Sequence, residues 1–81
     1  MADNFTFKKI KVLGVLSTSR SLWTKELALV SWNGKPPVLD IREWAPDGER
    51  MSKGCTFTEP ELRVLADIVE RMPILEKPIT P

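Results

Sequence analysis

The stretch Val38-Leu39-Asp40-Ile41-Arg42-Glu43-Trp44 alternates between apolar and polar residues from Leu39 to Arg42. Successive side chains of a β-strand point to opposite faces, so Leu39 and Ile41 share one face, which we expect to pack on the core. Arg42 and Trp44 share the other face, where a planar cation beside an indole can grip a phosphate and stack on a base. A half-buried antiparallel strand, with Trp44 closing the core and Arg42 merely solvated, explains the same pattern.

Three more strands are predicted around this one. Residues 7–16 form the first, in which Gly14 indicates a bulge or a close backbone approach. Residues 25–32 form the second, and Asn33-Gly34 favours a tight turn toward the third because both residues tolerate positive φ. Residues 53–57 form a short fourth strand. The hydroxyl-rich loop after the first strand either donates to phosphates or serves as a plain connection.

A helix is predicted after the fourth strand. Thr58 and Glu61 have the spacing of a capping box, and Pro60 is tolerated in the first helical turn. An apolar stripe broader than one small sheet demands then follows at helical spacing, formed by Leu62, Leu65, Ala66, Val69 and Met72. We expect it to cover the Leu39 and Ile41 face and to meet a partner helix.

The order of elements is therefore β-β-β-β-α, which is an α+β fold with a four-stranded antiparallel sheet and one C-terminal helix. We expect residues 1–81 to form a single domain, with an ordered core over about residues 7–72 and an irregular tail over residues 73–81. A chain of 81 residues buries only roughly 60% of its unfolded surface, so a second copy would add useful core.

Composition excludes several classes of function. The chain has one cysteine, Cys55, and no histidine, so an intramolecular disulfide is impossible and no metal site or cofactor is expected. No glycine-rich phosphate loop or catalytic set is visible, so we do not expect an enzyme. The absence of a long apolar run and of a signal peptide predicts a cytoplasmic protein, not associated with a membrane.

Charge is distributed unevenly. Residues 1–35 hold six basic and two acidic side chains, whereas residues 59–81 hold three basic and five acidic ones. An acidic helix folded away from a basic sheet would leave one positive face. The candidate binding residues on that face are Lys9, Lys11, Arg20, Trp23, Lys25, Trp32, Lys35, Arg42, Trp44 and Lys53.

Tryptophans interleaved with lysines and arginines are typical of a platform for single-stranded nucleic acid, because indoles stack on any base and cations neutralise phosphates. We expect one of the three tryptophans to belong to the core instead. The alternative is a protein–protein interaction module that uses the same face as a hot spot. Steeply salt-dependent binding of oligonucleotides would favour nucleic acid.

Several motifs carry a resemblance to a known family. They lie at residues 16–19, 23–27, 30–37, 38–44, 46–49, 53–54 and 57–61. The later motifs closely resemble the C-terminal domain of the positive cofactor four family of transcriptional coactivators. The earlier ones look like its small bacterial branch, the YdbC-like proteins. The similarity covers roughly residues 8–72.

The resemblance implies a homodimer formed through the helices and sequence-tolerant binding of single-stranded DNA, with RNA also open as a ligand. Arg42 matches the family arginine on the third strand, and Trp44 falls at its aromatic end, although only one aromatic stands where eukaryotic members have two. Trp32 matches an aromatic, and Lys35 and Lys53 match basic contacts. The implied role is transcription regulation or DNA maintenance at the nucleoid, with transcription or replication proteins as further partners.

Overall fold

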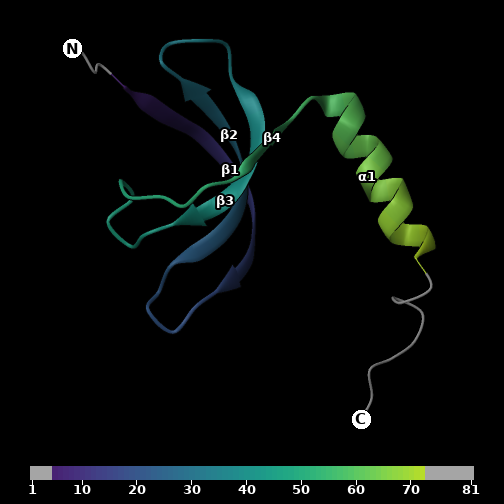
Figure 1. The fold of residues 1–81 in the computed structure, drawn as a ribbon, viewed down its shortest axis with the longest axis horizontal. Coiled ribbons are helices and arrows are strands. Elements are labelled where there is room, and N and C mark those ends of the chain that lie inside the picture. Colours follow the sequence, from purple (N-terminus) through teal and green to yellow (C-terminus); the bar gives the residue numbers. More distant parts are fainter. Residues whose placement is uncertain (1–4, 73–81) are drawn as a thin grey trace.

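The computed structural model describes residues 5–72, and the predicted tail lies outside this range. Four antiparallel strands form one sheet in the order β1-β2-β3-β4, and one helix follows (Figure 1). This confirms the predicted order of strands and helix. The elements are β1 (Phe7–Thr18), β2 (Thr24–Trp32), β3 (Val38–Trp44), β4 (Cys55–Phe57) and α1 (Glu59–Arg71).

The register between β2 and β3 sets the two faces of the sheet. Ala28 lies opposite Asp40 and Leu29 lies opposite Leu39, so the predicted alternation is confirmed. We call the two faces the inner and the outer face. The inner face carries Glu26, Ala28, Val30, Trp32, Asp40, Arg42 and Trp44, and the outer face carries Leu27, Leu29, Leu39, Ile41 and Phe57.

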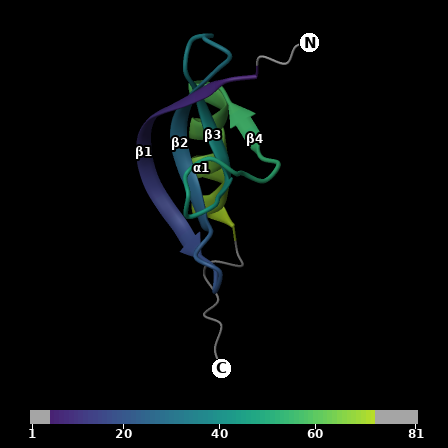
Figure 2. The same ribbon diagram turned by 90° about the vertical axis from the view of Figure 1, so that its left-hand side faces the viewer.

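Strand β1 curls over the inner face (Figure 2). It uses twelve residues against the nine of β2, and its register shifts at three places along the pairing. Extra residues on one strand increase its bend and twist. The curl brings the ring of Phe7 to 5.4 Å from that of Trp44, although β1 and β3 are not neighbours in the sheet.

The core therefore lies on the inner face. Ala28, Val30 and Trp44 are buried, and Phe7, Trp32 and Met51 pack around them. The expectation that Leu39 and Ile41 pack in the core while Arg42 and Trp44 face solvent is wrong, because β1 folds over the Arg42 and Trp44 side.

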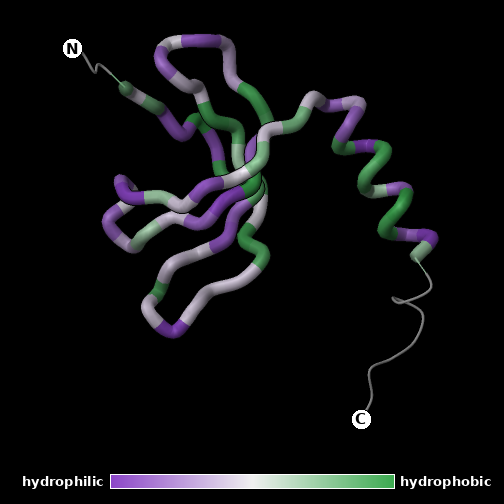
Figure 3. The backbone as a smooth tube through the Cα atoms, viewed as in Figure 1, coloured by the Kyte–Doolittle hydropathy of each residue, from purple (hydrophilic) through white to green (hydrophobic). Residues whose placement is uncertain are grey.

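Helix α1 has the predicted capping box, in which Thr58 Oγ1 accepts from the Glu61 N–H and the Glu61 carboxylate accepts from the Thr58 N–H. The helix nevertheless stands away from the sheet, and none of its residues is buried (Figure 1). Its alternating hydrophobic and hydrophilic segments are visible in Figure 3. The expectation that α1 covers the outer face is therefore wrong within one chain.

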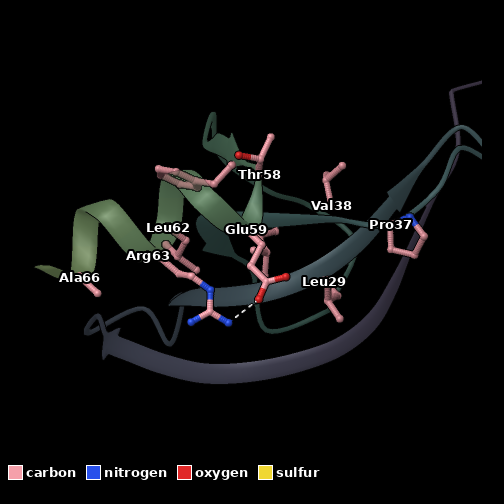
Figure 4. Close-up of a pocket in the computed structure, with 10 residues that line it drawn as sticks. Leu29, Pro37, Val38, Thr58, Glu59, Leu62, Arg63 and Ala66 are labelled. Carbon is pink, nitrogen blue, oxygen red and sulfur yellow. Dashed lines mark hydrogen bonds and ion pairs between the residues drawn. The ribbon is translucent and has the colours of Figure 1, made fainter.

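An apolar groove of about 750 Å³ separates α1 from the outer face. Leu29, Val38 and Leu39 line its sheet side, and Leu62 and Ala66 line its helix side (Figure 4). Within residues 5–72, no helix is long and apolar enough to cross a membrane.

Candidate nucleic-acid interface

Trp44 is the tryptophan of the core. Its side chain is only 1% exposed, and both Phe7 and Lys9 lie against its ring. The prediction that Trp44 stacks on a base is therefore wrong for this structure, because neither face of its ring is open to a ligand. The expectation that one of the three tryptophans belongs to the core is met by this residue.

Lys9 is held inside the curled sheet. Its Nζ lies 4.1 Å from the centroid of the Trp44 ring and donates to Glu26 Oε1 at 2.9 Å. Glu26 also accepts from the Thr24 hydroxyl at 2.6 Å. Burial raises the pKa of Glu26, but the bonds from Thr24 and Lys9 and the charge of Lys9 outweigh burial and lower it. The Glu26 carboxylate thus compensates the charge of Lys9, and a contact between Lys9 and phosphate stays a prediction.

Arg42 is held in the same way at the other indole of the inner face. Its guanidinium carbon lies 4.5 Å from the centroid of the Trp32 ring. Nε and Nη2 donate to the two carboxylate oxygens of Asp40 at 2.7 and 2.8 Å. Nη1 donates to the Ser52 carbonyl at 3.3 Å and to Met51 Sδ at 3.6 Å. Arg42 is therefore a fixed, charge-compensated group.

Gly54 allows β4 to lie against Arg42. A Cβ atom at this position would stand 2.4 Å from both Arg42 Cβ and the Ile41 carbonyl oxygen, and 2.8 Å from Arg42 Nε. Any side chain here would displace the guanidinium from Asp40 and Trp32. The Lys53-Gly54 motif thus has a steric cause, since the backbone must pass directly over the arginine.

Trp23 lies half-buried at the start of β2, at the far end of that strand from Trp32. The guanidinium of Arg50, from the loop between β3 and β4, lies 5.8 Å from its ring centroid. The Trp23 N–H donates to Ser19 Oγ at 3.2 Å, and the Ser19 N–H donates to the Trp23 carbonyl at 2.8 Å. Ser19 thus stabilises its own loop, which supports the plain-connection alternative.

Asp47 organises the loop that supplies Arg50. Its carboxylate accepts from the backbone N–H groups of Glu49 and Arg50 at 2.8 and 3.1 Å, and from Arg50 Nε at 2.9 Å. These bonds lower the pKa of Asp47 to about 2, chiefly through the two backbone donors. The carboxylate thereby positions Arg50 beside Trp23.

The remaining predicted cations lie on the surface. Lys25 is about half exposed and only 4.0 Å from Glu43, which makes a weak ion pair. The other four, Lys11, Arg20, Lys35 and Lys53, are exposed and form no ion pair with the rest of residues 5–72. Lys11 lies opposite Leu29 and Lys25 lies opposite Glu43, so both belong to the outer face. The expectation that all the candidate cations share one face with Trp32 is therefore wrong.

The sequence reasoning missed three residues that shape this region, namely Phe5, Asp40 and Arg50. Asp40 had a readable signal, because residues two apart on a strand share a face and Arg42 is its neighbour. Arg50 and Phe5 had none, since each reaches an indole that is distant along the chain.

Comparison with known proteins supports the resemblance. The family model described as Transcriptional Coactivator p15 (PC4) matches residues 20–68. A protein of Treponema pallidum (strain Nichols), described as uncharacterized, is 43% identical over 70 residues, which cover 86% of this chain and 82% of that protein. The assignment to a bacterial branch stays a prediction, because this relative has no described function. The match over residues 20–68 shows that the chain belongs to the Transcriptional Coactivator p15 (PC4) family.

Proposed function

We propose that the protein binds single-stranded DNA in a sequence-tolerant way. The observation that carries the proposal is the half-buried Trp32, which Arg42 and Phe5 flank at the end of β2, in a chain whose family is one of nucleic-acid-binding proteins. Arg42 and Phe5 both lie against the Trp32 ring, so the exposed ring of Phe5 is the aromatic surface of this cluster that is open to a base. An exposed aromatic ring stacks on any base, since every base has a π-face.

Phosphate contacts in this proposal come from the exposed cations, not from the buried ones. Lys9 and Arg42 are compensated by Glu26 and Asp40, so they have little net charge to offer a phosphate. Counterion release instead comes from the free surface side chains. These are Arg20, Lys35 and Lys53, because Lys11 and Lys25 lie on the outer face.

A homodimer formed through α1 is the second part of the proposal. The helix leaves Leu65, Ile68 and Val69 substantially exposed, and the outer face beside it is an open apolar groove. Exposed apolar surface of this kind marks an interaction site. A second copy would bury both surfaces and leave the inner-face rims of both sheets free for DNA.

The test is fluorescence anisotropy of a labelled oligo-dT, with a duplex of equal length and an RNA of equal length alongside, at two salt concentrations. We expect binding of the single strand that weakens steeply with salt and a clearly weaker duplex. Binding of the RNA, compared with that of oligo-dT, shows whether the protein binds both kinds of single strand.

The matched control is Lys53→Gln, which removes one exposed cation. For this variant, the slope of log affinity against log salt concentration should be shallower by about 0.7. That is the value for one phosphate contact to a single strand. Absence of oligo-dT binding at low salt would overturn the proposal. Salt-insensitive capture of a protein partner by the same surface would support the interaction-module alternative instead.

The proposed cellular role is transcription regulation or DNA maintenance in the cytoplasm, at the nucleoid. Support comes from the family description, which names a transcriptional coactivator. Proteins of transcription or replication are the partners that such a role would require.

A further inference from the structure

The turn between β2 and β3 contains the sequence Asn33-Gly34, and both residues are exposed. Their φ angles are positive, 54° for Asn33 and 76° for Gly34. Within residues 5–72, neither the Gly34 N–H nor the NH₂ group of the Asn33 side chain donates a hydrogen bond. A Cβ atom at Gly34 would meet no atom within 4 Å, so the surroundings of this nitrogen are open.

An asparagine that precedes a glycine has an intramolecular reaction available to it. The deprotonated backbone nitrogen of the glycine attacks the side-chain carbon Cγ, and a new N–Cγ bond forms. The Cγ–N bond of the amide breaks, and its nitrogen takes up a proton and leaves as ammonia. Water then opens the cyclic succinimide at either carbonyl group, which gives aspartate or isoaspartate. The net reaction consumes water and releases ammonia, so it needs no oxidant.

The turn at Asp47-Gly48 is protected from the same ring closure. Gly48 also has a φ of 76°, but its N–H donates to the Ala45 carbonyl at 2.9 Å. The Asp47 carboxylate accepts from two backbone N–H groups and from Arg50, which lower its pKa to about 2. An ionised carboxylate repels an attacking nitrogen anion and has no good leaving group. Asn33-Gly34 has neither form of protection.

Asn33 also ties the segment before β1 to the turn. Its N–H donates to the Thr6 carbonyl at 2.8 Å, and its Oδ1 accepts from the Thr6 N–H at 2.9 Å. The next residue, Phe5, lies with its ring centroid 6.0 Å from that of Trp32. Lys35, an exposed cation, follows two positions after Asn33. A chemical change at Asn33 therefore reaches both an aromatic cluster and a cation.

We propose that Asn33 is a site of spontaneous modification, and that its conversion to aspartate and isoaspartate weakens the binding of single strands. Aspartate keeps an oxygen acceptor for Thr6 but adds a negative charge close to Lys35. Isoaspartate adds a carbon atom to the main chain of the turn, so the paired bonds to Thr6 are lost and Phe5 loses its support. The chemical step is independent of the proposed function, and only its effect on binding rests on that function.

The first experiment incubates the unaltered full-length chain at neutral and at mildly alkaline pH and locates new acidic groups by mass spectrometry of its peptides. The chain has two asparagines and no glutamine, so deamidation arises at Asn4 or Asn33. We expect faster conversion of Asn33, because Asn4 precedes the bulky Phe5. Conversion should accelerate at the higher pH, since the attacking nitrogen must be deprotonated. An intact Asn33, or equal rates at the two asparagines, would overturn the proposal.

Gly34→Ala is the matched variant, because it adds a methyl group beside the attacking nitrogen. We expect it to lose the conversion of Asn33 over an incubation in which the unaltered chain reacts. Alanine is strained at a φ of 76°, so the circular dichroism of the variant must match that of the unaltered protein. An unchanged rate in a folded variant contradicts the reaction, and should the variant not fold, the comparison of Asn33 with Asn4 decides.

The second experiment measures oligo-dT binding by Asn33→Asp, which reproduces one product. We expect the slope of log affinity against log salt concentration to be shallower by about 0.7, because the new carboxylate compensates Lys35. Lys35→Gln should give the same change, and the two substitutions together should give no further change. Unaltered protein that has been incubated at alkaline pH also contains isoaspartate, so it should bind more weakly than Asn33→Asp.

The outcomes distinguish the modification from its effect on binding. If fresh unaltered protein does not bind oligo-dT, the proposed function falls, whereas acidic products at Asn33 still support the modification. If Asn33→Asp and the incubated protein bind oligo-dT as tightly as fresh protein, with the same slope, the effect on binding is overturned and the proposed function remains.

Discussion

At the scale of single residues, the inner face contains the same arrangement of three side chains at two places. A carboxylate of low exposure holds a cation over an indole, through Glu26 and Lys9 at Trp44 and through Asp40 and Arg42 at Trp32. Removing one partner of such a pair leaves an uncompensated charge and costs about 3–5 kcal/mol for fully buried pairs. The two indoles nevertheless differ, since Trp44 is enclosed and Trp32 is only half-buried.

Trp44→Ala should destabilise the domain severely. The enclosed ring fills the centre of the core, and deletion of a buried tryptophan costs about 3–5 kcal/mol through lost burial and the resulting cavity. Urea denaturation followed by circular dichroism measures the change. Trp23→Ala, at a half-buried loop position, is the control with a much smaller loss. Equal stability of the Trp44 variant and the unaltered protein would refute its place in the core.

The lowered pKa of Asp47 predicts that the folded protein loses stability in acid. Its pKa is lowered from 3.8 to about 2, so the folded state favours the ionised carboxylate. The stabilisation is complete above the unfolded pKa of about 4 and is lost as the pH falls through about 2. Asp47→Asn should therefore flatten the fall in the free energy of unfolding between pH 4 and pH 2, measured by urea titrations at each pH. A fall as steep as that of the unaltered protein would contradict this role.

At the scale of elements, β1 and β4 shape the inner face by opposite means. The extra length of β1 bends it until Phe7 reaches Trp44, whereas β4 has only three residues and a tight backbone approach at its start. Both strands lie at sheet edges, where bulges and short strands are common ways to limit unwanted pairing.

Gly14 in β1 and Gly54, the residue before β4, give a matched pair of variants. Gly54→Ala should destabilise by about 1–3 kcal/mol, because its Cβ would collide with Arg42 and the Ile41 carbonyl. Gly14→Ala should change stability little, since a Cβ there meets no atom within 4 Å. Thermal unfolding of both variants checks the contrast. Indistinguishable melting temperatures would show that the approach of β4 to Arg42 is not tight in solution.

At the scale of the whole molecule, one chain leaves apolar surface unpaired on both sides of the groove. A chain of 81 residues gains little stability from its own small core, so burial between two copies would add a substantial share. The proposed dimer also explains why α1 is capped and regular although none of its residues is buried in one chain.

Leu62→Glu should prevent this association. It places a charge in the groove, where dimer formation would bury it without a partner. Analytical ultracentrifugation should give a molecular mass of about twice 9.2 kDa for the unaltered protein. The mass of the variant should be close to 9.2 kDa. Asp67→Ala is the control, because it changes an exposed ion pair with Arg71 that contributes little. A monomeric unaltered protein would refute the dimer.

The sequence alone determined the local structure. Alternation in residues 38–44 predicted which side chains share a face, Asn33-Gly34 predicted the turn, and Thr58 with Glu61 predicted the helix start. These features depend on backbone geometry and neighbours within a few residues, so they can be read from spacing. The exposed cations of the candidate site were predictable for the same reason, since charged side chains favour water.

Only the tertiary structure decided which face of the sheet became the core. Alternation separates two faces but treats them alike, so it could not tell that Trp44 would be enclosed while Leu39 and Ile41 stayed on the outside. That choice follows from the curl of β1, which brings Phe7 to Trp44 from 37 positions away in the chain. The physical reason is that burial is settled by long-range packing, which no local pattern contains.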